Sequence, residues 1–179
     1  MFRAQKAKKK GLDITASVAI HNLCLTDSEL ESFDTSFKVK PPLRTSKDNK
    51  VLLKGVLNGT IDYVTTDHRP IDIEEKRVEF DNASYGTIGL ESAFGALRKI
   101  LELDETITSL TKGRERFGIF NPALEEGALA NLTLFNPDEE YSFQEENIFS
   151  KSKNAIFLNQ KMKGKVYGII NNGKLDLNG

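Results

Sequence analysis

The chain of 179 residues is poor in cysteine, in long apolar runs and in net charge. Its single cysteine, Cys24, excludes an internal disulfide framework and favours a reducing, cytoplasmic compartment. No stretch approaches about 18 consecutive apolar residues, and the N-terminus lacks an apolar signal-peptide core, so we expect neither a membrane span nor secretion. The net charge of −1 gives no electrostatic reason to expect nucleic acid or a membrane as a partner.

The composition is ordinary for a globular protein, with 39% hydrophobic and 28% charged residues. The length fits one domain with a small appendage. Lysines in residues 2–10 alternate with apolar side chains, which predicts a solvated helix ending at Gly11 rather than a binding surface. Cys24 lies among leucines, where a packed core thiol is favoured over a nucleophile.

Strand-like and helix-like patterns alternate over the first two thirds of the chain. Apolar alternation predicts a strand at 13–20, and a β-branched and aromatic run predicts another at 61–66. A capped helix is predicted between them at 46–58, and helices at 88–103 and 104–112 follow. The inward face of the helix at 46–58 would comprise Leu52, Leu53, Val56 and Leu57. The apolar stripe of the helix at 88–103 would comprise Ile88, Leu90, Phe94, Leu97, Ile100 and Leu101. This order predicts parallel strands joined by crossover helices.

The C-terminal part of the sequence has a different pattern. Strands are predicted at 130–135 and 164–171, and the Asn-Asn-Gly sequence that ends the second one predicts a hairpin turn. The chain is therefore expected to divide into an α/β unit, residues 1–125, and a small β layer, residues 126–179.

Polar side chains follow both strands of the predicted α/β unit. Asp67 comes directly after the strand at 61–66, and His21 directly after the strand at 13–20. In parallel α/β folds catalytic groups collect at the carboxyl ends of strands, so these two residues are candidates for a site. His68, next to Asp67, is a further candidate. The alternative interpretation is structural, with the aspartate capping a loop and the histidine satisfied within the core.

Several segments resemble the dihydroorotases, members of the metal-dependent amidohydrolase superfamily. The segment "TTDHRPIDIEEK" resembles the family's "TDHAPH", "SVAIHNLCLTD" its "VTPHHLLLTD", and "KVKPPLR" its "KMNPPLR". Likewise "ASYGTIGLESAF" resembles "APFGIIGLETAF", and "GALANLTLFNPDEEYSF" and "SKSKNAIFLNQKMKGKVYGIINNGK" resemble the family's closing segments. The resemblance covers essentially the whole chain, with the motifs in the family's order.

The resemblance implies an α/β fold, namely the C-terminal portion of a (β/α)8 amidohydrolase barrel plus part of a small β-sandwich layer. Residues 13–20 and 61–66 would belong to the last two βα units, as the seventh and eighth barrel strands. Asp67 matches the carboxylate that binds metal and acts as general base toward the attacking water. In the full-length family the metal is zinc, and the reaction is the reversible hydrolysis of the cyclic amide of dihydroorotate in pyrimidine biosynthesis.

The positions that would contact substrate depart from the family pattern. Lys40, Ile71 and Gly86 match family substrate contacts, but lysine stands for the family's asparagine and isoleucine for its second histidine. Lysine changes both charge and geometry, and the isoleucine side chain forms no hydrogen bond. Two alternatives therefore stay open: a non-catalytic relative that supports aspartate transcarbamoylase, or a hydrolase of another cyclic amide such as hydantoin or allantoin.

Most of the family's metal ligands have no counterpart in this sequence. The chain has two histidines and no His-x-His pair, and its first residue matches a position after the sixth barrel strand. We therefore expect the C-terminal half of a dihydroorotase-like protein, which alone binds no zinc and has no dihydroorotase activity.

Two parallel strands cannot close a barrel. Both edges of the pair would lack partners, and its inner face would expose Ile14, Val18, Ile61 and Val64. The expected partners are therefore the missing N-terminal half, or a second copy joined through the exposed strands, besides the small-molecule substrate that the resemblance implies.

Overall fold

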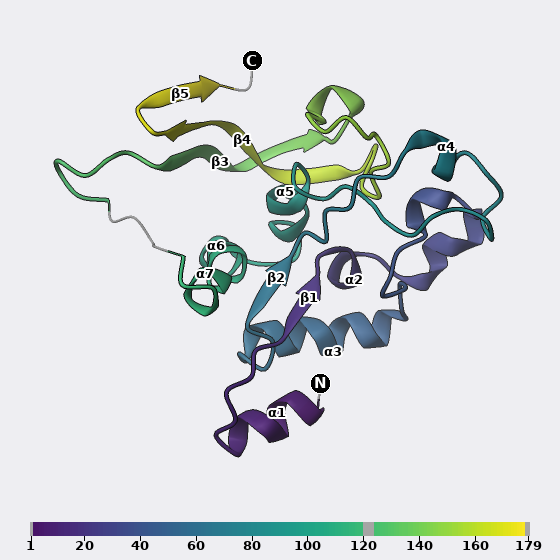
Figure 1. Ribbon diagram of the computed structural model, residues 1–179, viewed down its shortest axis with the longest axis horizontal. Coiled ribbons are helices and arrows are strands. Elements are labelled where there is room, and N and C mark those ends of the chain that lie inside the picture. The colour runs from purple at the N-terminus through teal and green to yellow at the C-terminus, as the bar shows by residue number, and fades with distance from the viewer. Residues whose placement is uncertain (1, 120–123, 178–179) are drawn as a thin grey trace.

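The computed structural model describes residues 2–119 and 124–177, and its strands form two sheets (Figure 1). One is a parallel pair, β1 (Ser17–Ala19) and β2 (Tyr63–Thr65), and the other is a three-stranded sheet formed by the C-terminal residues. Helix α3 (Ser46–Leu57) lies on one side of the parallel pair and the three-stranded sheet on the other. In these described ranges no helix combines the length and the apolar character needed to cross a bilayer.

The parallel pairing of the first two strands confirms the prediction from the sequence. Val18 is opposite Val64, and each strand has three residues in the ladder. The strands are shorter than the predicted ranges 13–20 and 61–66. At Ala16 the carbonyl still accepts the N–H of Asp62, but the N–H of Ala16 donates to the side chain of Asp62, at 2.8 Å, instead of to a strand carbonyl.

Helix α3 begins and ends close to the predicted bounds of 46–58. Thr45 and Asp48 form a capping box at its start, which satisfies N–H groups that have no partner within the helix. Leu52, Leu53 and Val56 pack against the core as predicted. The prediction for Leu57 is wrong, because this last residue of the helix is 53% exposed.

Two further helices confirm the predicted ranges, and a third is much shorter than predicted. Helix α1 (Phe2–Lys9) matches 2–10, and α6 (Leu103–Thr111) matches 104–112. The helix predicted at 88–103 is reduced to α5 (Ala93–Leu97), because Ile88 pairs with Ala155 and its N–H donates to Asn154. The remaining helical segments are α2 (His21–Cys24), α4 (Ile73–Lys76), α7 (Gly113–Arg116), η1 (Asp27–Ser32), η2 (Thr35–Phe37) and η3 (Glu145–Asn147).

The C-terminal sheet is antiparallel, in the order β3 (Leu132–Ser142), β4 (Lys161–Asn171) and β5 (Lys174–Leu177). The predicted hairpin joins β4 to β5, where Asn172 and Gly173 have φ values of 49° and 72°. Positive φ at both positions is typical of a tight hairpin turn. Strand β3 begins slightly later than the predicted range of 130–135 and continues to Ser142, whereas β4 begins at Lys161 and ends at Asn171, close to the predicted 164–171.

One continuous core contains side chains from both sheets. Val18 and Val64 of the parallel pair belong to the same buried cluster as Phe143, Phe157 and Met162 of the C-terminal part. Helix α5 packs on β4 through its glycine, since a Cβ at Gly95 would lie 2.9 Å from Met162. The division into 1–125 and 126–179 stays a prediction.

Burial corrects the expectation of an exposed apolar face on the parallel pair. Val18, Ile61 and Val64 are each no more than 8% exposed, and Ile14 is half-buried. The surrounding helices and the C-terminal segments cover these side chains, so the pair is exposed along its edges and not across an apolar face. In the described residues, β1 and β2 have no strand partner other than each other.

Candidate active site at the ends of the parallel strands

The two parallel strands bring His21 and Asp67 to the same end of the sheet. His21 follows β1 and begins α2, whereas Asp67 lies just after β2. The Nε2 atom of His21 is 4.0 Å from Oδ2 of Asp67. This placement confirms that the carboxyl ends of the two strands lie side by side.

His21 is completely buried and has no hydrogen-bond partner for either ring nitrogen among the described residues. Burial lowers the pKa of His21 to about 4, although the nearby charge of Asp67 acts in the opposite direction. The ring is therefore neutral near pH 7, with one N–H donor and one acceptor. Buried polar atoms are rarely left without partners, so this histidine is suited to a group that enters the site from outside the described residues.

Asp67 combines an exposed carboxylate with an uncommon backbone conformation. Its side chain is 45% exposed, and its φ of 46° is left-handed. Residues other than glycine in this region are uncommon, and they cluster at functional sites. No hydrogen bond to the carboxylate is found in the described part of the chain, so its oxygens are available to a water molecule, a ligand or a cation.

Among the described residues, the ring of His68 forms its hydrogen bonds with a different segment of the chain and not with His21 or Asp67. Nδ1 accepts the N–H groups of Gly89 and Leu90, at 3.2 and 3.3 Å. The carboxylate of Glu91 is 3.9 Å from the same nitrogen. Glu91 was not predicted as part of a site, and its apolar helical neighbours in the sequence gave no signal for it.

Two of the three positions matched to substrate contacts lie together. A Cβ on Gly86, whose φ is 147°, would lie 3.0 Å from Cγ1 of Ile71 and 3.1 Å from the side chain of Arg69. The N–H of Gly86 donates to the carbonyl of Lys38 at 3.0 Å, which places the segment leading to Lys40 beside this group. Lys40 itself is exposed and precedes a cis peptide bond to proline.

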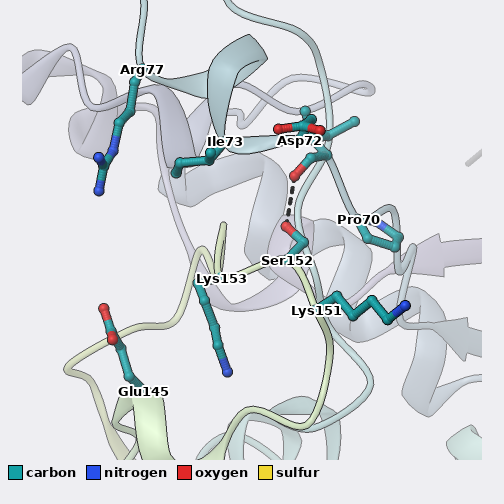
Figure 2. A pocket seen from close by; sticks show the side chains of 9 residues that line it. Pro70, Asp72, Ile73, Arg77, Glu145, Lys151, Ser152 and Lys153 are labelled. Atoms are coloured by element: carbon teal, nitrogen blue, oxygen red, sulfur yellow. Dashed lines mark hydrogen bonds between the residues drawn. The ribbon is translucent and has the colours of Figure 1, made fainter.

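Ile71 also borders a cleft of about 510 Å³ between the segment after β2 and the loop that precedes β4 (Figure 2). Ser152 closes one side by donating to the carbonyl of Ile71 at 2.8 Å. The lining residues are Pro70, Ile71, Asp72, Ile73, Arg77, Glu145, Lys151, Ser152 and Lys153. Asp67 is not among them, so the cleft adjoins the strand-end site without containing its carboxylate. The cleft's cationic residues Arg77, Lys151 and Lys153 were not predicted from the sequence.

The described residues do not form a metal site by themselves. No three histidine, cysteine, aspartate or glutamate side chains gather closely enough in residues 2–119 and 124–177 to hold an ion. A hydrolytic zinc site takes about three protein ligands in addition to water. Asp67 and His21 supply at most two donors, so the set is incomplete.

The fold of the chain is similar to that of solved amidohydrolase structures. No protein-family model matches the chain. The structure matches a D-hydantoinase with a TM-score of 0.86 and 23% identity, covering 99% of this chain and 42% of that one. It also matches the inactive dihydroorotase-like domain of the Chaetomium thermophilum CAD-like multifunctional protein, with a TM-score of 0.66 and 17% identity, covering 97% of this chain and 47% of that one. The fold is thus a mixed α/β portion of the fold found in hydantoinases.

Similarity in sequence narrows the family further than similarity in fold does. The chain is 39% identical over 176 residues to the dihydroorotase of Caldicellulosiruptor saccharolyticus and 38% identical over 176 residues to that of Bacillus subtilis, in each case covering 94% of this chain and 41% of the relative. The chain belongs to the dihydroorotase-like proteins of the amidohydrolase class. It spans about two fifths of the length of these curated relatives.

Proposed function

We propose that this chain forms one part of the active site of a cytoplasmic dihydroorotase-like amidohydrolase. The reaction would be the reversible hydrolysis of the cyclic amide of dihydroorotate in pyrimidine biosynthesis. Strands β1 and β2 would be the seventh and eighth strands of a (β/α)8 barrel, and β3–β5 part of its small β layer. The observation that carries the proposal is the free carboxylate of Asp67 at the end of β2, beside the neutral ring of His21.

Asp67 would act as the general base. Its carboxylate takes a proton from a water molecule as that water attacks the amide carbon, and the proton is then available to the departing ring nitrogen. In ring closure the same oxygen atoms move the proton in the opposite direction. The neutral ring of His21 supports this role, because a cation at that position would hold the carboxylate more firmly in its ionised form and make it a weaker base.

Zinc, which the family resemblance implies, would need donors from outside the described residues. Asp67 would be this chain's ligand in such a set. By itself the chain is therefore expected to be an incomplete and inactive portion, and the missing N-terminal half would be its partner.

A second candidate is a non-catalytic protein that supports aspartate transcarbamoylase. Lys40 and Ile71 favour it, because neither can replace the amide or imidazole that the resemblance assigns to those positions. A third is hydrolysis of another cyclic amide of the hydantoin or allantoin type, which altered substrate positions would permit.

The proposal is tested with a chimera in which this chain replaces the matching 176-residue region of the Bacillus subtilis dihydroorotase. The chimera should hydrolyse dihydroorotate, and Asp67→Asn should reduce kcat by roughly 10²–10⁴-fold, as expected for loss of a general base. Asp34→Asn is the matched control, because this exposed carboxylate caps η2 by accepting the Ser36 N–H and asparagine serves equally well as a cap.

Substitutions at the contact positions separate the alternatives. If a folded, metal-loaded chimera is inactive and Lys40→Asn with Ile71→His restores turnover, the non-catalytic reading is supported. Turnover of hydantoin or allantoin without turnover of dihydroorotate would support the third candidate.

A further inference from the structure

The ring of His68 ties the end of β2 to a distant segment of the chain. Its Nδ1 accepts the N–H groups of Gly89 and Leu90, at 3.2 and 3.3 Å. Its backbone pairs with Thr87, and the N–H of the following residue donates to the Thr87 carbonyl at 2.7 Å. Directly after Asp67, therefore, both the side chain and the backbone are fixed to residues 87–90.

The conformation of Asp67 requires support of this kind. A left-handed φ at a residue other than glycine is energetically unfavourable and persists where the surroundings impose it. On the upstream side the ladder ends with the N–H of Ile20 donating to the carbonyl of Thr65, at 2.9 Å. The Asp67 carboxylate forms no hydrogen bond in the described residues, so the backbone is held by bonds at Thr65 before it and at His68 after it, and not through its own side chain.

The segment that His68 binds is itself fixed in place. A Cβ at Gly89 would lie 2.4 Å from the carbonyl oxygen of Thr66, so only glycine permits this approach to the end of β2. Oε1 of Glu91 accepts both the backbone N–H of Ser150, at 2.9 Å, and its hydroxyl. Burial acts to raise the pKa of Glu91, but the hydrogen bonds from Ser150, the backbone N–H of Glu91 itself and the nearby ring of His68 together lower it. The N–H donors thus belong to a rigid support that extends to the loop before β4.

We propose that His68 is a positioning residue, which holds Asp67 in its left-handed conformation by accepting the Gly89 and Leu90 N–H groups at Nδ1. Two N–H donors directed at Nδ1 require a lone pair there, so the ring carries its proton on Nε2. The importance of Asp67 rests on the proposed function, whereas its geometry is measurable without any turnover.

The test compares His68→Asn with His68→Leu in the full chain, labelled for NMR. Asparagine places Oδ1 at the position of Nδ1, two bonds from Cβ, and so keeps the acceptor, whereas leucine has similar bulk and no acceptor. In His68→Leu the amides of Gly89 and Leu90 should exchange roughly fivefold faster, because a hydrogen bond contributes about 1 kcal/mol. The Cα and Cβ shifts of Asp67 should also leave the left-handed range, and His68→Asn should restore both measurements.

Unchanged Asp67 shifts in a folded His68→Leu variant would overturn the proposal. If that variant does not fold, the ¹⁵N shifts of the His68 ring in the unmodified chain decide, because they report which ring nitrogen carries the proton. A proton on Nδ1 contradicts the proposal, and an unprotonated, hydrogen-bonded Nδ1 supports it.

In an active chimera, His68→Leu should lower kcat more than it changes KM, with recovery in His68→Asn. An inactive chimera would count against the proposed function alone, since the NMR comparison does not depend on activity.

Discussion

Nε2 of His21 lies 4.0 Å from Oδ2 of Asp67, although the two residues follow different strands. The distance is too long for a hydrogen bond, and the imidazole is fully buried whereas the carboxylate reaches solvent. A buried neutral ring therefore faces a free carboxylate across a gap. This pairing follows directly from the parallel register of β1 and β2, which brings both strand ends to one edge.

The burial of His21 predicts that acid weakens the fold. The pKa of His21 is about 4 in the folded chain and about 6.5 in an unfolded one, so between these values the unfolded chain binds the proton more readily. The free energy of unfolding should fall as the pH is lowered from about 6.5 to about 4, by up to about 3 kcal/mol. Urea unfolding at several pH values measures it.

His21→Leu is the comparison variant, because it fills similar space and does not titrate. Its free energy of unfolding should change less over that window. An equal decrease in both proteins would assign the acid sensitivity to carboxylates elsewhere in the chain.

Lys76 predicts a pH dependence of the same sign in the alkaline range, because its pKa is lowered as well. Its ammonium is buried and donates to the carbonyl of Thr35 at 2.8 Å. Burial, aided by the positive charge of Lys38 and opposed by Asp34, lowers the pKa of Lys76 to about 8. Between about pH 8 and 10.5 the unfolded chain holds the proton more readily, so the free energy of unfolding should rise with pH, by roughly 1–3 kcal/mol.

Lys76→Met removes this titration while keeping an unbranched chain of similar length. Its free energy of unfolding, measured by urea titration from pH 7.5 to about 10.5, should lack the rise seen in the unmodified protein. A rise of the same size in both would show that other groups cause it.

Zinc analysis of the purified chain gives a third prediction. Since no group of three ligand side chains occurs in the described residues, residues 1–179 alone should bind no stoichiometric zinc and should not turn over dihydroorotate. Elemental analysis after dialysis against zinc measures the first, and a dihydroorotate assay the second. The Bacillus subtilis dihydroorotase, treated in parallel, is the control, and bound zinc together with turnover in the short chain would contradict the prediction.

The sequence predicted the elements whose signals are local. The β-branched run before Asp67 and the Asn-Asn-Gly turn each depend on neighbouring residues, and both were found. The helix at 88–103 was overestimated because its first residues are bound to partners far along the chain, including His68 and Asn154. Helical periodicity carries no information about such contacts.

The candidate site shows the same limit. Strand-end placement predicted that Asp67 and His21 lie at one edge, but the support through Glu91 and Ser150 joins residues 59 positions apart and has no local pattern. Lys76 was missed for a related reason: lysine is rarely buried, and the carbonyl groups that accept its protons come from a separate loop.

The last prediction concerns association. The buried state of Val18 and Val64 removes one reason to expect a partner, but two others remain. The parallel pair has no further strand on either edge in the described residues, and the edge strand β5 carries Leu175 and Leu177 at 59% and 57% exposure. Unpaired edges and exposed apolar side chains on an edge strand favour pairing with another chain. We therefore expect residues 1–179 to form a dimer or a complex with the missing N-terminal half.

Size-exclusion chromatography with light scattering measures the mass of the chain alone and after mixing with the N-terminal region of the Bacillus subtilis dihydroorotase. Leu175→Lys with Leu177→Lys should weaken self-association through β5, because edge lysines oppose strand pairing. The matched control, Lys174→Arg, keeps the edge charge and should leave the mass unchanged. If the double variant remains a dimer, β5 is not the joining surface. A monomer that unfolds cooperatively and binds no N-terminal region would contradict the prediction, because it would show that the short parallel pair is stable with both edges open.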